Sequence, residues 1–222
     1  METETSKGRI YTYPMTRYTY DATRSVVWRE ICRYLQPQLR ERSTVLDLGA
    51  GYCDFLRYIG ADKKYALDID PTLVRYWPAD VQALVQSALE PLPLEEGSIS
   101  VVLASNFFEH FPIDDCRKIL EEVHRVLKPG GKLIAIQPNI RLQPGRYYDD
   151  YTHRTPFTEV SFANFLESLG WRILDSEGRF LPFSMKTTRL PKSWWLVRLY
   201  LALPFRPFAG QFLVVAGKPN NA

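Results

Sequence analysis

The sequence contains few cysteines and no long apolar run. Its three cysteines, Cys32, Cys53 and Cys116, are widely spaced and form no CxxC pair, which argues against a zinc site and against a disulfide scaffold. No uninterrupted apolar stretch reaches about 18 residues, the length that a membrane-spanning helix needs. Residues 1–20 are polar and aromatic and lack the apolar segment of a secretory signal. These absences indicate a cytoplasmic protein.

The charge and composition are those of an ordinary globular protein. The formal net charge of +3 is too small to indicate nucleic-acid binding by itself, because nucleic-acid-binding proteins concentrate basic residues on one face. Hydrophobic residues make up 45% of the sequence and charged residues 24%, which excludes a disordered or low-complexity chain. A length of 222 residues suits one α/β domain with insertions. We therefore expect a single domain over residues 1–222.

Strand and helix patterns alternate along most of the chain. Short β-branched and apolar runs predict strands over 44–48, 64–67, 81–86, 99–104, 132–137, 171–174 and 211–216. Periodic apolar residues with turn signals predict helices over 52–59, 71–77, 114–127 and 158–169. Gly60 and Gly170 are expected to end two of these helices in a left-handed conformation, and Thr158 to cap one. This alternation predicts a doubly wound α/β fold with a mostly parallel sheet and helices on both faces.

The first two predicted strands end in residues that suit a nucleotide-like ligand, because ligands bind at the carboxyl ends of strands in such sheets. Asp47 precedes the bend 49–51, where two glycines let the backbone approach a ligand; a simple tight turn is the alternative. Asp68, after the second strand, can accept both hydroxyls of a ribose, whereas Asp70 suits a helix cap. The dinucleotide fingerprint requires Gly or Ala where Asp54 stands, which disfavours a dehydrogenase.

Four ordered blocks carry a recognisable pattern: VLDLGAGYCDF (45–55), ALDID (66–70), LPLEEGSISVVLASNFFEHF (92–111) and RVLKPGGKLIAIQPN (125–139). Together they resemble the class I methyltransferases that depend on S-adenosylmethionine (SAM). The resemblance covers residues 25–180 and implies a Rossmann-like fold with a seven-stranded sheet. Within that family, PNIRLQPGRYYDDYTHRTPFT (138–158) is similar to a subgroup often encoded beside polysaccharide and glycosyltransferase genes.

The resemblance implies a SAM site on matching positions. The residues around the first bend would hold the methionine moiety, Asp68 the ribose, Ser87 with Ala88 the adenine edge, and Asn106 would flank the methionine end. The family usually has a third glycine where Cys53 stands, and often an Asp where Ser87 stands. The implied cofactor-binding residues are Asp47, Gly49, Ala50, Gly51, Asp68, Ile69, Ser87, Ala88 and Asn106.

Methyl transfer from a sulfonium is an in-line displacement, so the enzyme mainly aligns the reacting atoms and excludes water. A hydroxyl acceptor also needs a base, and His153, with Asp150 beside it in the acceptor-side loop 138–157, is the first candidate. His110 is the second. Hydrogen bonds that only pin the loop are the alternative for His153 and Asp150, and a structural or cofactor-side role is the alternative for the pair Glu109 and His110. No metal site is expected.

Two segments outside these blocks have unusual compositions. Residues 181–210 contain no Asp or Glu, and their cations are Lys186, Arg189, Lys192, Arg198 and Arg206. Because tryptophans and leucines accompany these cations, the segment predicts contact with an anionic membrane or a lipid-linked phosphate substrate. An apolar helix packed on the sheet is the alternative. In the N-terminal extension 1–24, the aromatic run 9–20 is expected to cover either the SAM site or the core.

The expected function is SAM-dependent transfer of a methyl group to an acceptor hydroxyl of a sugar, a glycan or a lipid-linked saccharide. S-adenosylhomocysteine is the expected product. Two alternatives stay open: a SAM-binding module with weak catalysis, favoured by the departures at Cys53 and Ser87, and an RNA methyltransferase, favoured by the basic segment 181–210. Nucleic acid is not the expected partner. The expected location is the cytoplasm, with or without peripheral contact at the inner face of the membrane.

Overall fold

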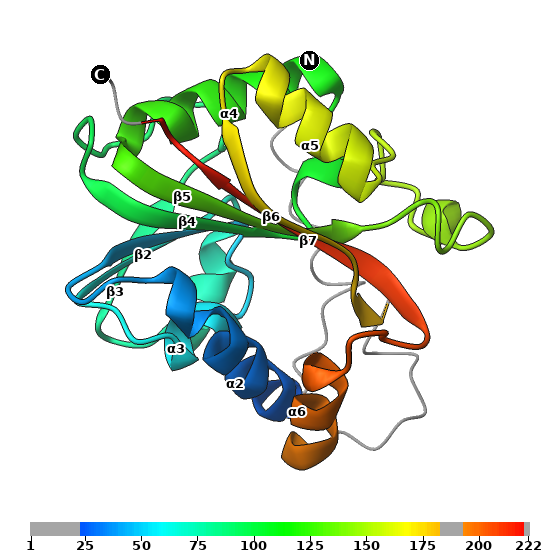
Figure 1. Cartoon of the computed structure of the whole chain (residues 1–222). Helices are drawn as coiled ribbons and strands as arrows, with labels where there is room; N and C mark the ends of the chain where they lie inside the picture. Colours follow the sequence, from blue (N-terminus) through cyan, green and yellow to red (C-terminus); the bar gives the residue numbers. More distant parts are fainter. Residues whose placement is uncertain (1–22, 183–192, 220–222) are drawn as a thin grey trace, which may run out of the picture.

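One twisted sheet organises the part of the chain that the computed structural model describes, residues 23–182 and 193–219 (Figure 1). Its strands are β1 (Thr44–Leu48), β2 (Lys63–Asp68), β3 (Val81–Val85), β4 (Ile99–Ser105), β5 (Leu127–Pro138), β6 (Arg172–Pro182) and β7 (Ala209–Gly217). The α-helices are α2 (Arg24–Leu35), α3 (Asp54–Tyr58), α4 (Ile113–Val126), α5 (Glu159–Ser168) and α6 (Trp194–Ala202). Short 3-10 helices are η2 (Gln36–Gln38), η3 (Pro71–Tyr76), η4 (Phe108–His110) and η5 (Tyr147–Asp149). The aromatic run 9–20 and the cations Lys186, Arg189 and Lys192 lie outside the described residues.

The strands lie in the order β3-β2-β1-β4-β5-β7-β6. Strands β1 to β5 pair in parallel, whereas β7 runs antiparallel to both β5 and β6. Helices α4 and α5 cover one face of the sheet, and α2, α3 and α6 cover the other (Figure 1). The predicted doubly wound, mostly parallel sheet with helices on both faces is therefore confirmed. Its strand order reverses between β1 and β4, the place where open α/β sheets bind their ligands.

Alternate residues of β1 enter the two halves of the core. Leu46 and Leu48 pack among side chains of α4 and α5, while Val45 packs among those of α2 and α3. Because side chains alternate between the faces of a strand, Asp47 lies on the same face as Val45. Asp47 is 4% exposed and its neighbours in β1 are buried as well. A carboxylate is thus held inside an otherwise apolar strand.

Two predicted helix ends are confirmed and one is wrong. Thr158 caps α5 by accepting a hydrogen bond from the Ser161 backbone N–H (3.1 Å), and Gly170 after that helix has a φ of +83°. The prediction for Gly60 is wrong, because its φ is not positive. Instead, Gly60 donates its N–H to Oε1 of Gln36 (2.8 Å) and accepts from Nε2 of the same side chain (3.1 Å). A contact with the end of α2 thus takes the place of a local cap.

Three elements differ from their predictions in kind, length or existence. The helix predicted over 71–77 is the 3-10 helix η3, which Asp70 caps, as predicted, by accepting from the Thr72 N–H (2.9 Å). The strand predicted over 171–174 extends further as β6, because β7 supplies hydrogen-bonding partners along it. Helix α2 was not predicted. Its buried apolar residues nevertheless recur at steps of three and four, as in an amphipathic helix: Val27, Trp28, Ile31, Cys32 and Leu35.

The chain bends sharply after β1. Gly49, Gly51 and Cys53 all have positive φ angles, of 67°, 53° and 62°. Phe107, just past β4, lies against this bend, and a Cβ atom at position 49 would lie 2.8 Å from its Cδ2. A side chain at position 49 would therefore meet both backbone strain and a collision with the ring.

We expect Gly49→Ala to lower the free energy of unfolding by about 2–5 kcal/mol, the sum of left-handed strain and overpacking against Phe107. Gly97→Ala is the matched control, because Gly97 has a φ of +62° but no atom within 4 Å of the point that a Cβ atom would occupy. In the control, the free energy of unfolding should fall only by the cost of the left-handed strain, about 1–2 kcal/mol. Urea unfolding without SAM measures both changes. Equal losses in the two variants would contradict the contact with Phe107.

Candidate functional site

Asp68 joins the bend after β1 to the end of β2. Its Oδ2 accepts the Gly51 backbone N–H (2.9 Å) and its Oδ1 accepts the Asp70 N–H (3.0 Å). Burial raises the pKa of Asp68, and the backbone N–H groups of Asp70, Gly51 and Ile69 oppose the rise. Each carboxylate oxygen has two lone pairs, so each can accept one further hydrogen bond. The carboxylate is thus positioned for two more donors, such as the hydroxyls of a vicinal diol.

Three carboxylates lie close enough to affect one another at this bend. Burial, followed by the charges of Asp68 and Asp54, raises the pKa of Asp47 well above its usual range. Arg24 of α2 pairs with Asp54 (3.0 Å) and offsets one of these charges. A cationic ligand group would relieve the remaining repulsion between Asp47 and Asp68, so the bend after β1 favours an ammonium or a sulfonium.

The residues predicted for the adenine edge lie at the ends of β2 and β3. Ile69 follows β2 and is 42% exposed, which leaves an apolar side chain at the edge of the sheet. Ser87 and Ala88 are half-buried after β3. The Ser87 hydroxyl oxygen accepts the Leu89 backbone N–H (3.2 Å), and its own hydrogen can be donated to a ligand acceptor. A serine here suits a ring nitrogen of a purine, whereas an aspartate would suit an amino group.

Two glutamines that the sequence did not single out hold the chain after β4. Gln137 accepts the Phe107 N–H at Oε1 (3.1 Å) and donates Nε2 to the Ala104 carbonyl (3.0 Å). Gln211 of β7 donates to Oδ1 of Asn106 (2.7 Å). Asn106 has a φ of +50° and donates its N–H to the Ile136 carbonyl (2.8 Å). The predicted methionine-side residue is therefore fixed by three neighbouring strands.

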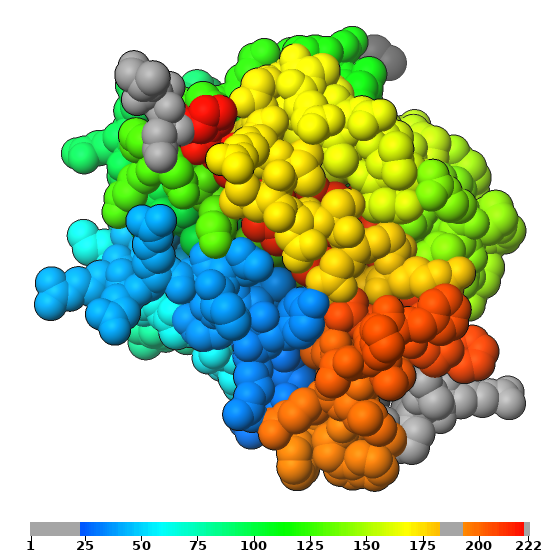
Figure 2. Space-filling view, viewed as in Figure 1, coloured from blue at the N-terminus to red at the C-terminus, as the bar shows by residue number. Residues whose placement is uncertain are grey.

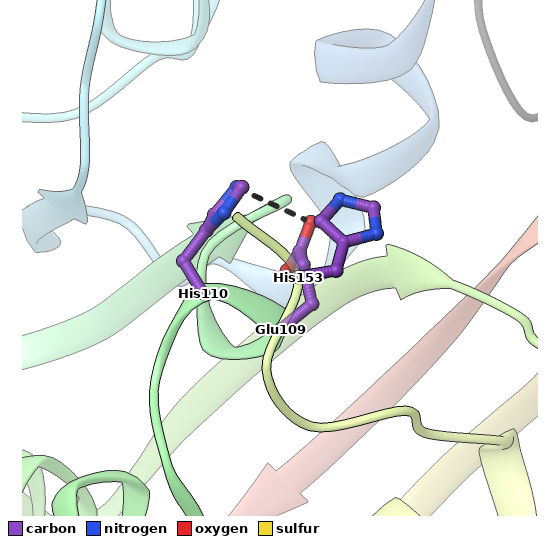
Figure 3. Close-up of side chains that lie close together, drawn as sticks. All are labelled: Glu109, His110 and His153. Carbon is purple, nitrogen blue, oxygen red and sulfur yellow. Dashed lines mark ion pairs between the residues drawn. The ribbon is translucent and has the colours of Figure 1, made fainter. Parts of the chain in front are cut away.

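The end of η4 and the loop after β5 form a polar group that we call the acceptor-side cluster: Glu109, His110, Asp150, Thr152 and His153. Figure 3 shows three of these side chains, Glu109, His110 and His153, close together. The His110 and His153 rings lie 5.2 Å apart between centroids. Nε2 of His110 lies 3.8 Å from Oε1 of Glu109, and Nδ1 of His110 lies 2.9 Å from Oγ1 of Thr152. The Thr152 hydroxyl donates to Oδ1 of Asp150 (2.6 Å). The three predicted catalytic residues thus come together, with two residues not on that list.

Backbone contacts hold this loop against η4. The Glu109 carbonyl accepts the N–H groups of Arg154 (2.6 Å) and Thr155 (3.2 Å). The Thr155 hydroxyl donates to the Phe111 carbonyl (2.7 Å), and the Tyr147 hydroxyl donates to the Thr155 carbonyl (2.8 Å). The position of His153 relative to His110 is therefore set by the backbone on both sides.

Glu109 is the unusual member of the acceptor-side cluster. Its side chain is fully buried, and neither carboxylate oxygen has a hydrogen-bond partner among the residues that the structure describes. Burial raises the pKa of Glu109 to about 8 and lowers the pKa of His110 to about 4. One donor atom each from Glu109, His110 and His153 lies within 4.8 Å of the others, a set that can hold a metal ion. The sequence pointed to Glu109 only as the neighbour of His110.

The sequence profile of a methyltransferase domain matches residues 46–135. This stretch runs from β1 to β5 and contains Asp47, Asp68 and His110. Asp150 and His153 lie beyond it.

Two curated relatives match a similar part of the chain. The sarcosine/dimethylglycine N-methyltransferase of Halorhodospira halochloris is 33% identical over 129 residues, which are 53% of this chain and 45% of that protein. The ubiquinone/menaquinone biosynthesis C-methyltransferase of Brucella anthropi is 30% identical over 125 residues, 50% of this chain and 47% of that protein. The chain spans about half the length of the curated relatives it matches. The names of these two relatives do not support the narrower resemblance to a polysaccharide-associated subgroup.

A solved structure extends the likeness over nearly the whole chain. A SAM-dependent methyltransferase from Archaeoglobus fulgidus superposes with a TM-score of 0.68 at 21% identity, covering 94% of this chain and 99% of that one. At that identity the likeness shows the shared fold. The chain therefore has the fold of that methyltransferase, and its residues 46–135, from β1 to β5, match the profile of a methyltransferase domain.

Proposed function

We propose that the chain binds SAM in the crevice between β1 and β4 and transfers its methyl group to an acceptor hydroxyl. The main support for this proposal is the geometry of Asp68. Its carboxylate accepts the Gly51 and Asp70 N–H groups and keeps one lone pair on each oxygen for the ribose hydroxyls. Asp47 favours the positively charged methionine end, because its repulsion with Asp68 is relieved by a cation. Ile69, Ser87 and Ala88 would contact the adenine.

The acceptor-side cluster supports a hydroxyl acceptor. A hydroxyl must lose its proton as the oxygen attacks the methyl carbon, while the C–S bond breaks and its electron pair goes to sulfur. His153, with Asp150 nearby, is the first candidate for promoting this step, and His110 is the second. A sugar, a glycan or a lipid-linked saccharide is the acceptor class that we propose.

The described cations of the basic segment do not favour RNA as the acceptor. Arg198 forms two hydrogen bonds with Glu30 (2.8 and 3.0 Å). Arg206 is 6% exposed and pairs with Glu177. Both guanidinium groups are thus committed to carboxylates of the same chain, which leaves them poorly suited to phosphates.

The exposed face of α6 supports peripheral contact with a membrane. Among the described residues, no helix is both long and apolar enough to cross a bilayer. However, α6 exposes Trp194 and Trp195 (53% each) and Leu199 (55%), beside α2 in Figure 2. Arg29 and Arg33 of α2 line a hollow of about 600 Å³ together with Trp194. Tryptophans next to arginines suit the interface of an anionic membrane, where a lipid-linked acceptor would be found.

Asp68→Asn should weaken SAM binding about 30-fold, because an amide oxygen replaces one charged acceptor at a cost of about 2 kcal/mol. The amide keeps the size of the side chain and can still accept one backbone N–H. Asp62→Asn, an exposed acid just before the other end of β2, is the control and should bind SAM as the wild type does. Isothermal titration calorimetry with SAM measures both. Unchanged affinity in Asp68→Asn would remove the proposed ribose contact.

Replacing Trp194 and Trp195 together by Ser should lower binding to phosphatidylglycerol vesicles at least about fivefold, because two half-exposed indoles lose their contact with the interface. Val160→Ser is the control, since Val160 is 48% exposed on α5, on the other face of the sheet. Co-sedimentation with vesicles gives the bound fraction. A wild-type chain that stays in the supernatant at low salt would refute the membrane contact.

A further inference from the structure

The Glu109 carboxyl group lacks the partners that a buried carboxyl group normally has. It is 0% exposed, and within residues 23–182 and 193–219 neither oxygen has a hydrogen-bond partner. Burying such a group without compensation costs several kcal/mol, so native proteins pair it with a proton donor, a cation or a metal ion. Its nearest ionisable neighbour, His110, is 3.8 Å away, too far for a hydrogen bond.

Nearby side chains supply the remaining ligands for a cation. Glu109 and His110 are adjacent on η4, and His153 approaches from the loop after β5 (Figure 3). One donor atom of each lies within 4.8 Å of the other two. A metal ion bound at about 2 Å from each ligand requires separations of about 3–4 Å, so a shift of about 1 Å closes the set.

His110 is oriented in the manner of a metal ligand. The Thr152 hydroxyl uses its single hydrogen on Asp150, so it must accept from Nδ1 of His110 at 2.9 Å. The neutral ring then carries its lone pair on Nε2, the nitrogen nearer to Glu109. Histidine ligands commonly donate their second ring N–H to an anchored acceptor of this kind. The pair Thr152 and Asp150 therefore fixes the tautomer that ligation needs.

We propose that Glu109, His110 and His153 bind a divalent transition-metal ion. Two imidazoles and one carboxylate favour zinc or its neighbours in the first transition series over magnesium and calcium, which prefer ligand sets of oxygen alone. Three protein ligands also leave a coordination position open.

The open position gives this metal a role that rests on the proposed function. An acceptor hydroxyl bound there loses its proton more readily, because the cation stabilises the alkoxide. The proton passes to water, the oxygen attacks the methyl carbon, and the C–S electron pair returns to sulfur. In this arrangement the two histidines hold the ion, and the metal replaces a general base.

The test is metal binding by the full chain, carrying no polyhistidine tag and freed of metal by a chelator. Titration with Co²⁺ should give visible d–d absorption that saturates at one equivalent, and Zn²⁺ should abolish it by displacement. Glu109→Gln and His153→Asn should each weaken Co²⁺ binding at least about tenfold. His124→Asn is the control, because the chain has three histidines and His124 lies on α4 beside Trp171. This variant should bind Co²⁺ as the wild type does.

The Co²⁺ and SAM titrations test the metal site and the proposed function separately. No Co²⁺ absorption in the wild type, or an equal loss in His124→Asn, overturns the metal site, as does full binding by Glu109→Gln. Calorimetry with SAM on the same samples checks that each variant is folded. Tight SAM binding without Co²⁺ binding overturns only the metal site, whereas absent SAM binding overturns the proposed function whatever the metal result.

Discussion

The hydrogen bond from the Gly51 amide to the Asp68 carboxylate is the contact on which the candidate SAM site depends. It ties the bend after β1 to the end of β2, two segments that the parallel pairing of these strands brings to one edge. The bond also presents the carboxylate to the crevice with lone pairs remaining. The Asp68 side chain thus both holds the bend at Gly51 and supplies the carboxylate that would recognise the ligand. A substitution of Asp68 therefore affects both roles together.

The chain after β4 and the loop after β5, at the same edge of the sheet, are held by uncharged groups. After β4 the backbone is held by amide side chains of Gln137 and Gln211, which reach across from neighbouring strands. Beyond them, the loop after β5 folds back onto the Glu109 carbonyl through the Arg154 and Thr155 amides. The candidate SAM site therefore depends on the charged carboxylate of Asp68, whereas the acceptor side is held by hydrogen bonds from amide side chains and backbone groups. The two relatives named above are, by their names, methyltransferases that act on a nitrogen and on a carbon acceptor.

Much of the fold could be predicted from the sequence because most strands contain short apolar runs that alternate along the chain with helix patterns and turn signals. Asp68 at the end of β2 and Asp70 as a cap followed from local pattern. The two glutamines did not, since only the register of β4, β5 and β7 reveals what they bond. The burial of Glu109 could not be predicted for a similar reason, because the loop that folds onto it, at Arg154 and Thr155, is distant in sequence. Helix α2 could have been predicted, because its buried apolar residues recur at helical spacing, but the partner of its buried Glu30, Arg198, lies far away in the sequence.

The position of β7 has a consequence for biosynthesis. All nine of its residues are buried, and it is inserted between β5 and β6, which both precede it in the chain. Gln211 at its start also orients Asn106. A nascent chain emerging from the ribosome can pair β1 to β5 early, but it must keep a gap for the last strand. Until that strand arrives, two edges stay open to mispairing, and the pocket cannot acquire its finished shape.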